Sequence, residues 1–521
     1  MKKHILMTTG LFLMCMLCGC GKSGAYHTTV SNLDTNQKVT LTIAIPYETN
    51  KALNTVANSF MTQYPNVSVN LQYVEDYDTN AVQLFKDNRL DMILQKGILN
   101  EEYMMKDEES GEKIPTGEMP DDYFYNYAAD TEIDFSGTSS DISNNYRHAY
   151  INSDGAETEY IYSYPLGGET RGVFVNKTLL DTYGLSVPTN YTELLSCCET
   201  LKQNGLIPIQ GGVSTAAYSL GLASAVNPVV HDETALRRMS TAEEGVSTLF
   251  EDILRKYYTL ATNRYIDYKA AEENGYFTLT TELGQAQSFL GLQTDENTFE
   301  VTKPENGYGY VVFMPYISSM GTTLDTLIDE YELQTEYVFI CSPMNDEGSV
   351  SPAYVTPYYG ICANKNSENL VWIREFVNFI FQPEQNKIYA EEANIIPNTT
   401  DAMQVAAKQY GLDAEQDIAL CGQILFSDDY NGFDPLAASL VTILKCNAQK
   451  YMVNLNLDAN GNIQYETDAE GKEFLYLGNG ETVIYPESVG EADPAKPGYA
   501  YCTFDYFMDD TENEFAKYRV D

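Results

Sequence analysis

The sequence YPLGGETRGVFVNKTLLDTYGLSVP, residues 164–188, decides the fold that we expect for this chain. It opens with a turn signal, a proline followed by two glycines. The β-branched and aromatic run Val173-Phe174-Val175 then predicts a buried strand. A brief helix is predicted from Lys177 to Tyr183, because Gly184 stands where a helix C-terminal cap is expected. A second helix, predicted over Tyr191 to Asn204, leads through Gly205 into a short apolar segment.

The order and spacing of these pieces resemble the sugar-type (family 1) extracellular solute-binding proteins that serve ABC importers. The resemblance covers about residues 38–95 and 160–445. In this stretch the matching residues are Pro165, Phe174, Asn176, Lys177, Gly184, Leu185, Pro188, Leu201, Gly205, Pro208 and Ile209. It implies an α/β fold, a two-lobed periplasmic-binding-protein-like (type II) clamp, in which the chain first crosses between the lobes here.

The residues before this stretch predict a parallel sheet. Lys38 to Ile45 and Val67 to Val74 alternate as strands, and Leu90 to Leu94 is a third apolar run. Asn50 to Tyr64 and Thr79 to Asn88 have helical spacing between them. This βαβαβ order requires right-handed crossovers and a parallel sheet.

The N-terminus has the pattern of a secretion signal. Lys2 and Lys3 precede the apolar run from Ile5 to Leu17, which is too short to span a membrane as a mature helix. Leu17-Cys18-Gly19-Cys20 resembles a bacterial lipobox, which implies that Cys20 carries the lipid and anchors the protein to the membrane. The alternative is an ordinary secretory signal with an incidental cysteine.

The expected organisation follows from these patterns. It comprises a signal peptide (1–19), a flexible tether (20–37), a first lobe (38–160) with an acidic insertion or lid at 100–147, a second lobe (161–305), a return to the first lobe with the second crossing (306–345), a closing strand and helices shared between the lobes (346–450), and a β-rich C-terminal appendage (451–521). Two hairpin signals, Asn460-Gly461 and Gly478-Asn479-Gly480, predict a β-hairpin appendage in the last part. A disordered loop is the alternative for 100–147.

Composition limits the partners. The formal net charge is −44, with 75 acidic and 31 basic residues, so nucleic acid is an unfavourable partner. The seven cysteines that remain after Cys15, Cys18 and Cys20 are scattered and odd in number, which is not a disulfide framework. No metal or cofactor motif is present: Asp458 to Asn462 lacks the glycine of a calcium loop, because Ile463 takes its position.

Ligands of such sheets bind outside the carboxyl ends of the strands. Carboxylates beside aromatic rings suit a sugar, which offers hydroxyl groups and apolar C–H faces. Tyr316 takes a position that the resembled family commonly fills with tryptophan, and the one tryptophan, Trp372, is expected in the core. The predicted ligand-binding residues are Tyr47, Glu48, Asp76, Tyr77, Gln95, Glu169, Arg171, Tyr218, Tyr316, Tyr358 and Tyr359.

The sequence therefore predicts a monomeric, membrane-anchored binding protein rather than an enzyme. It would capture a small solute, a sugar or oligosaccharide, by hinged closure and deliver it to the permease subunits of an ABC importer. The sequence has no GxSxG, HExxH, Walker or GxGxxG motif. Two alternatives stay open: a surface glycoside hydrolase with a carboxylate pair, and an adhesive or scaffolding lipoprotein.

Overall fold

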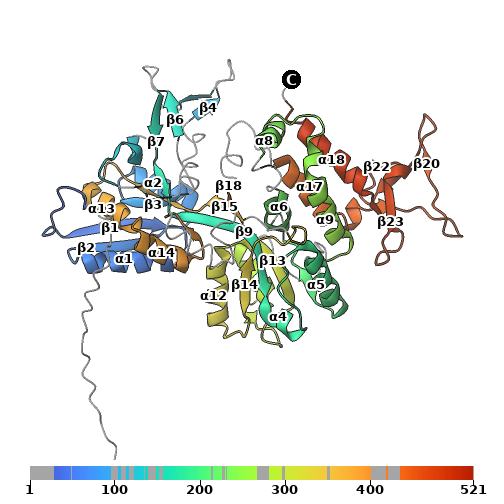
Figure 1. The fold of residues 1–521 in the computed structure, drawn as a ribbon, viewed down its shortest axis with the longest axis horizontal. Coiled ribbons are helices and arrows are strands. Elements are labelled where there is room, and N and C mark those ends of the chain that lie inside the picture. Colours follow the sequence, from blue (N-terminus) through green and yellow to red (C-terminus); the bar gives the residue numbers. More distant parts are fainter. Residues whose placement is uncertain are drawn as a thin grey trace, which may run out of the picture.

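The computed structural model describes residues 29–47, 50–95, 104–106, 113–115, 122–133, 135, 137–138, 148–151, 157–212, 215–225, 229, 232–266, 281–295, 298, 300–348, 353–399, 418–420 and 434–519 of the chain. These residues form two α/β lobes, each built on its own sheet, and a C-terminal region attached to the second lobe (Figure 1).

The first lobe is built on a five-stranded sheet. Its strand order is β2 (Val67–Tyr73), β1 (Val39–Ile45), β3 (Met92–Gln95), β16 (Gly360–Ala363) and β8 (Ser163–Pro165). The predicted parallel pairing of β1 with β2 and β3 is confirmed, and β16 runs antiparallel to β3. The alternation in β1 explains the packing: its odd-numbered side chains meet α1 (Lys51–Gln63), α13 (Leu370–Ile380) and α14 (Pro383–Ala393), whereas Ala44 meets α2 (Tyr77–Lys86) on the other face. Trp372 is 2% exposed in this core, as predicted.

The second lobe is built on a seven-stranded sheet. Its order is β10 (Ile207–Ile209), β13 (Val311–Ile317), β9 (Gly167–Asn176), β15 (Ala353–Pro357) and β18 (Ile418–Leu420), and β14 (Tyr337–Ile340) and β17 (Ile396–Pro397) also pair with β9. The helical elements of this lobe are α4 (Lys177–Thr182), α5 (Tyr191–Gln203), the π-helix η5 (Ala217–Leu222), α6 (Ala223–Ala225), α8 (Glu233–Ser240), α9 (Glu251–Thr262), α11 (Glu282–Leu290), α12 (Met320–Glu330) and α17 (Asp434–Leu444). Asn176 and Asn190 cap α4 and α5, so both helices begin where the sequence pattern placed them.

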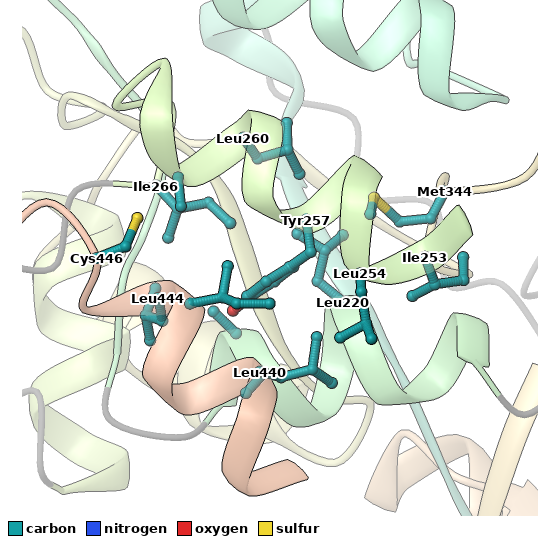
Figure 2. Close-up of a cluster of buried hydrophobic side chains, with 14 of the residues drawn as sticks. Leu220, Ile253, Leu254, Tyr257, Leu260, Ile266, Met344, Leu440, Leu444 and Cys446 are labelled. Carbon is teal, nitrogen blue, oxygen red and sulfur yellow. The ribbon is translucent and has the colours of Figure 1, made fainter. Parts of the chain in front are cut away.

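The core of the second lobe is apolar around a buried tyrosine. Figure 2 shows Tyr257 of α9 surrounded by Leu220, Leu440 and Leu444, which come from η5 and α17. The Tyr257 hydroxyl makes no hydrogen bond to the described residues, and burial raises its pKa far above the usual value. This ring is therefore held by packing alone.

Within the described residues, the chain crosses between the two sheets three times, at one place. Only Leu166 separates β8 from β9, and only Tyr358 and Tyr359 separate β15 from β16, while α14 of the first lobe leads through Ile395 into β17 of the second. The Leu166 amide donates to the Tyr359 carbonyl (3.0 Å) and the Tyr358 amide to the Gly167 carbonyl (2.8 Å). The crossings thus form one hinge, from which β9 extends into the second lobe (Figure 1).

A buried amide pair joins the third crossing to the first. Asn386 donates to the Leu166 carbonyl (2.9 Å), and Asn398 donates to the Pro165 carbonyl (2.7 Å). Asn386 also accepts the Asn398 amide (2.7 Å). Both side chains are fully buried, so this network fixes the three segments relative to one another.

Two expected boundaries differ in the structure. The first lobe does not end at residue 160, because β8 still pairs with β16, and the crossing lies at Leu166. The segment 306–345 does not return to the first lobe, because β13 and β14 both pair with β9 in the second sheet. The second crossing lies instead at Tyr358-Tyr359, where the β-rich run from Ala353 continues from one sheet into the other.

The segment 100–147 is only partly the loop or lid that we expected. β4 (Met104–Lys106) and β5 (Lys113–Pro115) form a small hairpin, and β6 (His148–Ile151) and β7 (Glu157–Tyr160) form another. In contrast, Phe124 and Tyr127 are each 1% exposed in the first lobe. Arg374 of α13 holds Asp130 through two hydrogen bonds (2.5 and 2.7 Å), so residues 122–133 are part of that lobe.

The expected tether is shorter than residues 20–37. Val30 is 2% exposed, and its amide donates to the buried carboxylate of Glu375 (2.9 Å), which also accepts the Tyr64 hydroxyl (2.5 Å). The chain is therefore attached to the first lobe from residue 30 onward. Cys20 and the signal segment lie outside the described residues.

The C-terminal region is not a separate appendage. β19 (Val453–Asn454), β20 (Glu466–Thr467), β21 (Glu473–Leu477), β22 (Val483–Ile484), β23 (Val489–Ala492) and β24 (Tyr499–Cys502) form an antiparallel sheet, and β21 and β22 pair across residues 478–482. A helix that we did not predict, α18 (Phe504–Ala516), follows. Phe504, Phe507 and Phe515 join the core of the second lobe, beside α9 and α17 (Figure 1).

A small antiparallel strand pair, β11 (Gln293–Thr294) and β12 (Val301–Thr302), follows α11 in the second lobe.

Candidate ligand-binding site

The first residues of β9, just past the hinge, place a carboxylate and a guanidinium group together. Glu169 is only 4% exposed and accepts a hydrogen bond from the Ser319 hydroxyl (2.9 Å). Arg171 lies two positions further along the strand, so both side chains leave the same face of the sheet. The Arg171 guanidinium carbon lies 5.3 Å from the centroid of the Tyr218 ring, a cation–π distance. β9 thus brings opposite charges and an aromatic face to one place.

Tyrosines from both lobes surround this pair. Tyr47 follows β1 in the first lobe, and Tyr316 is on β13 in the second. Burial, followed by the charges of Glu282 and Glu169, raises the pKa of Tyr316 to about 12. The pKa of Tyr47 is also raised, by the surrounding protein and then by the charges of Glu282 and Tyr359, although 52% of this residue is exposed to solvent. The Glu282 carboxylate therefore acts on a tyrosine of each lobe, which places all of these groups around one space.

The second crossing adds two more rings. Tyr358 and Tyr359 are packed edge to face, with ring centroids 5.2 Å apart. Burial, then the neighbouring Tyr389 and Glu169, raises the pKa of Tyr358 well above its usual value. The hinge itself therefore forms one wall of the site.

This arrangement favours a neutral polyhydroxyl ligand. All three shifted phenols stay protonated at neutral pH, so each can donate and accept a hydrogen bond. A carboxylate accepts from hydroxyl groups, a guanidinium donates, and aromatic faces pack on C–H surfaces. Within the described residues, no three His, Cys, Asp or Glu side chains lie close enough together to hold a metal ion.

A comparison with known families decides what kind of protein this is. Residues 44–387 match the family model of the bacterial extracellular solute-binding proteins. The chain belongs to that family. Among curated protein sequences, none matches this solute-binding protein.

Solved structures show the same fold. One is a binding protein of an ABC transporter from Bifidobacterium animalis subsp. lactis in complex with mannobiose, with 14% identity and a TM-score of 0.50 over 95% of this chain and 99% of that one. Another is a manno-oligosaccharide specific solute-binding protein from the same bacterium in complex with mannotriose, with 14% identity and a TM-score of 0.50 over 93% and 95%. A sugar transporter from Bacillus licheniformis in complex with stachyose has 15% identity and a TM-score of 0.46 over 78% and 94%. The two-lobed fold that the sequence predicted is thereby confirmed.

The solute-binding protein brings together seven of its eleven predicted ligand-binding residues: Tyr47, Glu169, Arg171, Tyr218, Tyr316, Tyr358 and Tyr359. Gln95 lies next to them, because it pairs with Gly360 beside Tyr359. Its side-chain oxygen is buried and makes no hydrogen bond with the described residues.

The loop after β2 does not join this cluster. The Tyr77 hydroxyl donates to the Ala44 carbonyl (3.0 Å) and accepts the Leu94 amide (2.8 Å), so it ties two strands together. Asp76 is exposed at the start of α2, with a left-handed φ of 49°. Glu48 lies outside the described residues.

Sequence reasoning missed Glu282 and Ser319. Glu282 lies in the first turn of α11, where an acidic residue is favoured by the helix dipole in any protein. Ser319 precedes α12 and has no distinguishing pattern around it. Only the packing of α11 and α12 against β13 shows that the two residues lie at the site.

None of the helices in the described part of this solute-binding protein is long and apolar enough to cross a membrane.

Proposed function

We propose that this protein captures a small carbohydrate between its lobes, closes on it by bending at the hinge, and delivers it intact to the permease subunits of an ABC importer. The observation that carries the proposal is the group formed by Glu169, Arg171 and the tyrosines of both lobes at the crossing point. The ligands of the two similar structures from Bifidobacterium, mannobiose and mannotriose, support an oligosaccharide.

Closure follows from where the ligand contacts lie. Tyr47 belongs to the first lobe, whereas Tyr316 and Glu282 belong to the second. A sugar that contacts both lobes binds the closed form more tightly than the open form, and only this difference in affinity drives closure. The importer would then recognise the closed form.

We also propose that Cys20 carries a lipid anchor and that the protein acts as a monomer. Since Val30 is fixed to Glu375, the lipid-bearing Cys20 lies ten positions before the first lobe. A chain of that length reaches at most about 36 Å. The first lobe would thus stay close to the membrane while the second lobe moves. Mass spectrometry of the membrane fraction tests this: an acylated Cys20 peptide is expected, and an unmodified peptide in the medium contradicts it.

Calorimetric titration of the mature chain with mannobiose, mannotriose, raffinose and stachyose tests the function, with product analysis of each mixture. We expect binding of at least one saccharide and its recovery unchanged. Cleavage would favour the glycoside hydrolase alternative, for which Glu169 and Glu282 supply a carboxylate pair. Absence of binding to any of the panel, together with no thermal shift in a wider sugar screen, would contradict the proposal.

A further inference from the structure

A group of buried polar side chains lies in the second lobe, next to the proposed site. Gln210 follows β10 and is 2% exposed, and Gln285 of α11 is 3% exposed. The Gln210 side-chain amide donates to the Gln285 carbonyl (3.4 Å), and the Thr215 hydroxyl donates to the Gln285 side-chain oxygen (3.0 Å). Gln210, Thr215 and Gln285 therefore connect the loop after β10, the helix that contains Tyr218, and α11.

Two buried atoms here lack a hydrogen-bond partner among the residues that the structure describes. The Gln210 side-chain oxygen makes no hydrogen bond within the described residues. The hydroxyl of Ser219, one turn beyond Thr215 and 1% exposed, makes none either. Buried polar atoms in proteins are almost always hydrogen-bonded, to protein, ordered water or ligand. These two atoms therefore indicate that a polar group from outside the chain binds near them.

The group lies at the same sheet edge as Tyr316. β10 and β13 are parallel, with Ile209 opposite Phe313, and the Gln210 amide donates to the Phe313 carbonyl (2.8 Å). Phe313 lies three positions before Tyr316 on β13. Gln210 and Tyr316 therefore both lie toward the carboxyl-terminal ends of their strands, the end at which ligands bind in α/β sheets.

The backbone of Gly212 packs closely against the side chains of Thr215 and Gln285. A Cβ atom at this position would lie 2.5 Å from the Gln285 side-chain oxygen and 2.5 Å from the Thr215 hydroxyl. Only glycine lets the backbone approach that closely without displacing them. Thr215 is half-buried, so the group reaches the surface on this side.

Glu282 lies one turn before Gln285 on α11, at the outer end of the group. It is half-buried, and its charge acts on both Tyr47 and Tyr316. Glu282 therefore stands between the tyrosines of the hinge site and the buried amides, so a ligand that extends from the tyrosines toward Gln285 passes it.

We propose that Gln210, Thr215 and Gln285, with Glu282 at the mouth, form a second subsite that binds the hydroxyl groups of a terminal sugar residue. The subsite rests on the proposed carbohydrate function and deepens it, because it makes the protein select for the length of the saccharide. A disaccharide held by the tyrosines leaves it empty, and a longer saccharide fills it.

Gln285→Met and Gln287→Met provide a matched test. Both replace a glutamine on α11 with a side chain of similar size that lacks the amide, but residue 287 points about 200° away around the helix. The probes are mannobiose, mannotriose, raffinose and stachyose, with calorimetric affinity and melting temperature measured for each variant and for the unaltered protein.

For Gln285→Met we expect about tenfold weaker binding of the longest saccharide that the unaltered protein binds, and a smaller change for the shortest. Gln287→Met is expected to bind all of them unchanged. Thr215→Val, which is half-buried, gives the same expected pattern and serves if Gln285→Met does not fold.

Equal affinities of Gln285→Met and the unaltered protein for every saccharide would overturn the subsite, since the unpartnered atoms would then hold only water. A loss that is equal for short and long saccharides would overturn the selection for length. If the unaltered protein binds none of the probes, the proposed function itself fails, and the subsite with it.

Discussion

Tyr316 lies on the sheet of the second lobe and faces the candidate ligand-binding site that we propose. It is half-buried on β13 and lies near Arg171, which opposes the rise of its pKa. At a sugar-binding position, an aromatic ring offers apolar contact area and a flat face against which a sugar ring can pack. Its ring therefore supplies contact area that a smaller residue cannot replace.

Tyr316→Ala is expected to weaken saccharide binding by about 1–3 kcal/mol, which is about 5- to 150-fold, because a ring contact and its buried area are lost. Calorimetry of the variant measures this. Tyr310→Ala, at a 43% exposed tyrosine just before the same strand, is the control and should bind normally. An unchanged affinity in Tyr316→Ala would remove this residue from the site.

For single residues, the sequence predicted the kinds of side chain at the candidate site better than it predicted which residues supply them. Glu169 and Arg171 were predicted because they lie in the stretch around β9, and Tyr358 and Tyr359 because they precede a recognisable strand. Nothing in the sequence shows that the Tyr77 hydroxyl turns inward to bond two strands. Glu282 was missed because its position in a helix first turn has an ordinary explanation.

The hinge is an element in which chain segments from different crossings pack closely against one another. At Gly167, a Cβ atom would lie 2.4 Å from the Ile396 carbonyl oxygen and 2.7 Å from the Ile395 side chain. The first and third crossings therefore touch through backbone atoms at this point. A methyl group here must push the two crossings apart.

Gly167→Ala is expected to lower the free energy of unfolding by about 1–3 kcal/mol, as overpacking of a close contact does, and to weaken saccharide binding because the tyrosines move apart. Denaturant unfolding and calorimetry measure the two effects. Gly137→Ala, where a Cβ would meet nothing within 4 Å, is the control. Identical unfolding curves for Gly167→Ala and Gly137→Ala would contradict the close contact.

Two buried ion pairs attach segments whose position in the fold the sequence did not predict. Arg374 holds Asp130 of the 122–133 segment, and Arg264 holds Asp493 of the C-terminal region (2.5 Å), with both aspartates 1% exposed. Burial, the largest single effect, raises the pKa of each carboxyl group, but the arginine hydrogen bond and charge together with backbone and tyrosine hydrogen bonds outweigh it, and the net pKa is lowered. These pairs therefore stabilise the fold only while the aspartates are ionised.

Asp493→Asn is expected to lower the free energy of unfolding at pH 7 by about 3–5 kcal/mol, because Arg264 loses its buried partner. Since the folded pKa lies below the unfolded value of about 3.9, the difference from the unaltered protein should persist above about pH 5 and shrink as the pH falls below 4. Urea unfolding at several pH values checks this, with the exposed Glu470→Gln as control. A difference that grows toward acid would contradict the sign.

At the scale of elements, periodicity predicted the first lobe and the stretch around β9 well, because their strands and helices alternate with clear caps and breakers. It misjudged 306–345, because an apolar strand such as β13 does not reveal which of two sheets it joins. It also predicted an appendage for the C-terminal region. In the structure, α18 instead packs through Phe504, Phe507 and Phe515 onto the second lobe. Some of these contacts join residues about 250 positions apart, and such contacts leave no local sequence pattern.

The whole molecule is two lobes with separate cores that share one hinge and one group of polar and aromatic side chains. Each lobe keeps its own sheet, so bending at Leu166, Tyr358-Tyr359 and Ile395 moves the lobes without disturbing either core. The residues of the candidate site are divided between the lobes, so in the proposed function a bound sugar would contact both lobes and complete the closed form.

Small-angle X-ray scattering of the mature chain, with and without a saturating concentration of a saccharide that calorimetry shows to bind, tests this claim most directly. We predict that the saccharide lowers the radius of gyration and that Tyr316→Ala, at the same saccharide concentration, remains nearer the unliganded value. A bound saccharide that leaves the radius of gyration unchanged would contradict closure of the two lobes on the ligand.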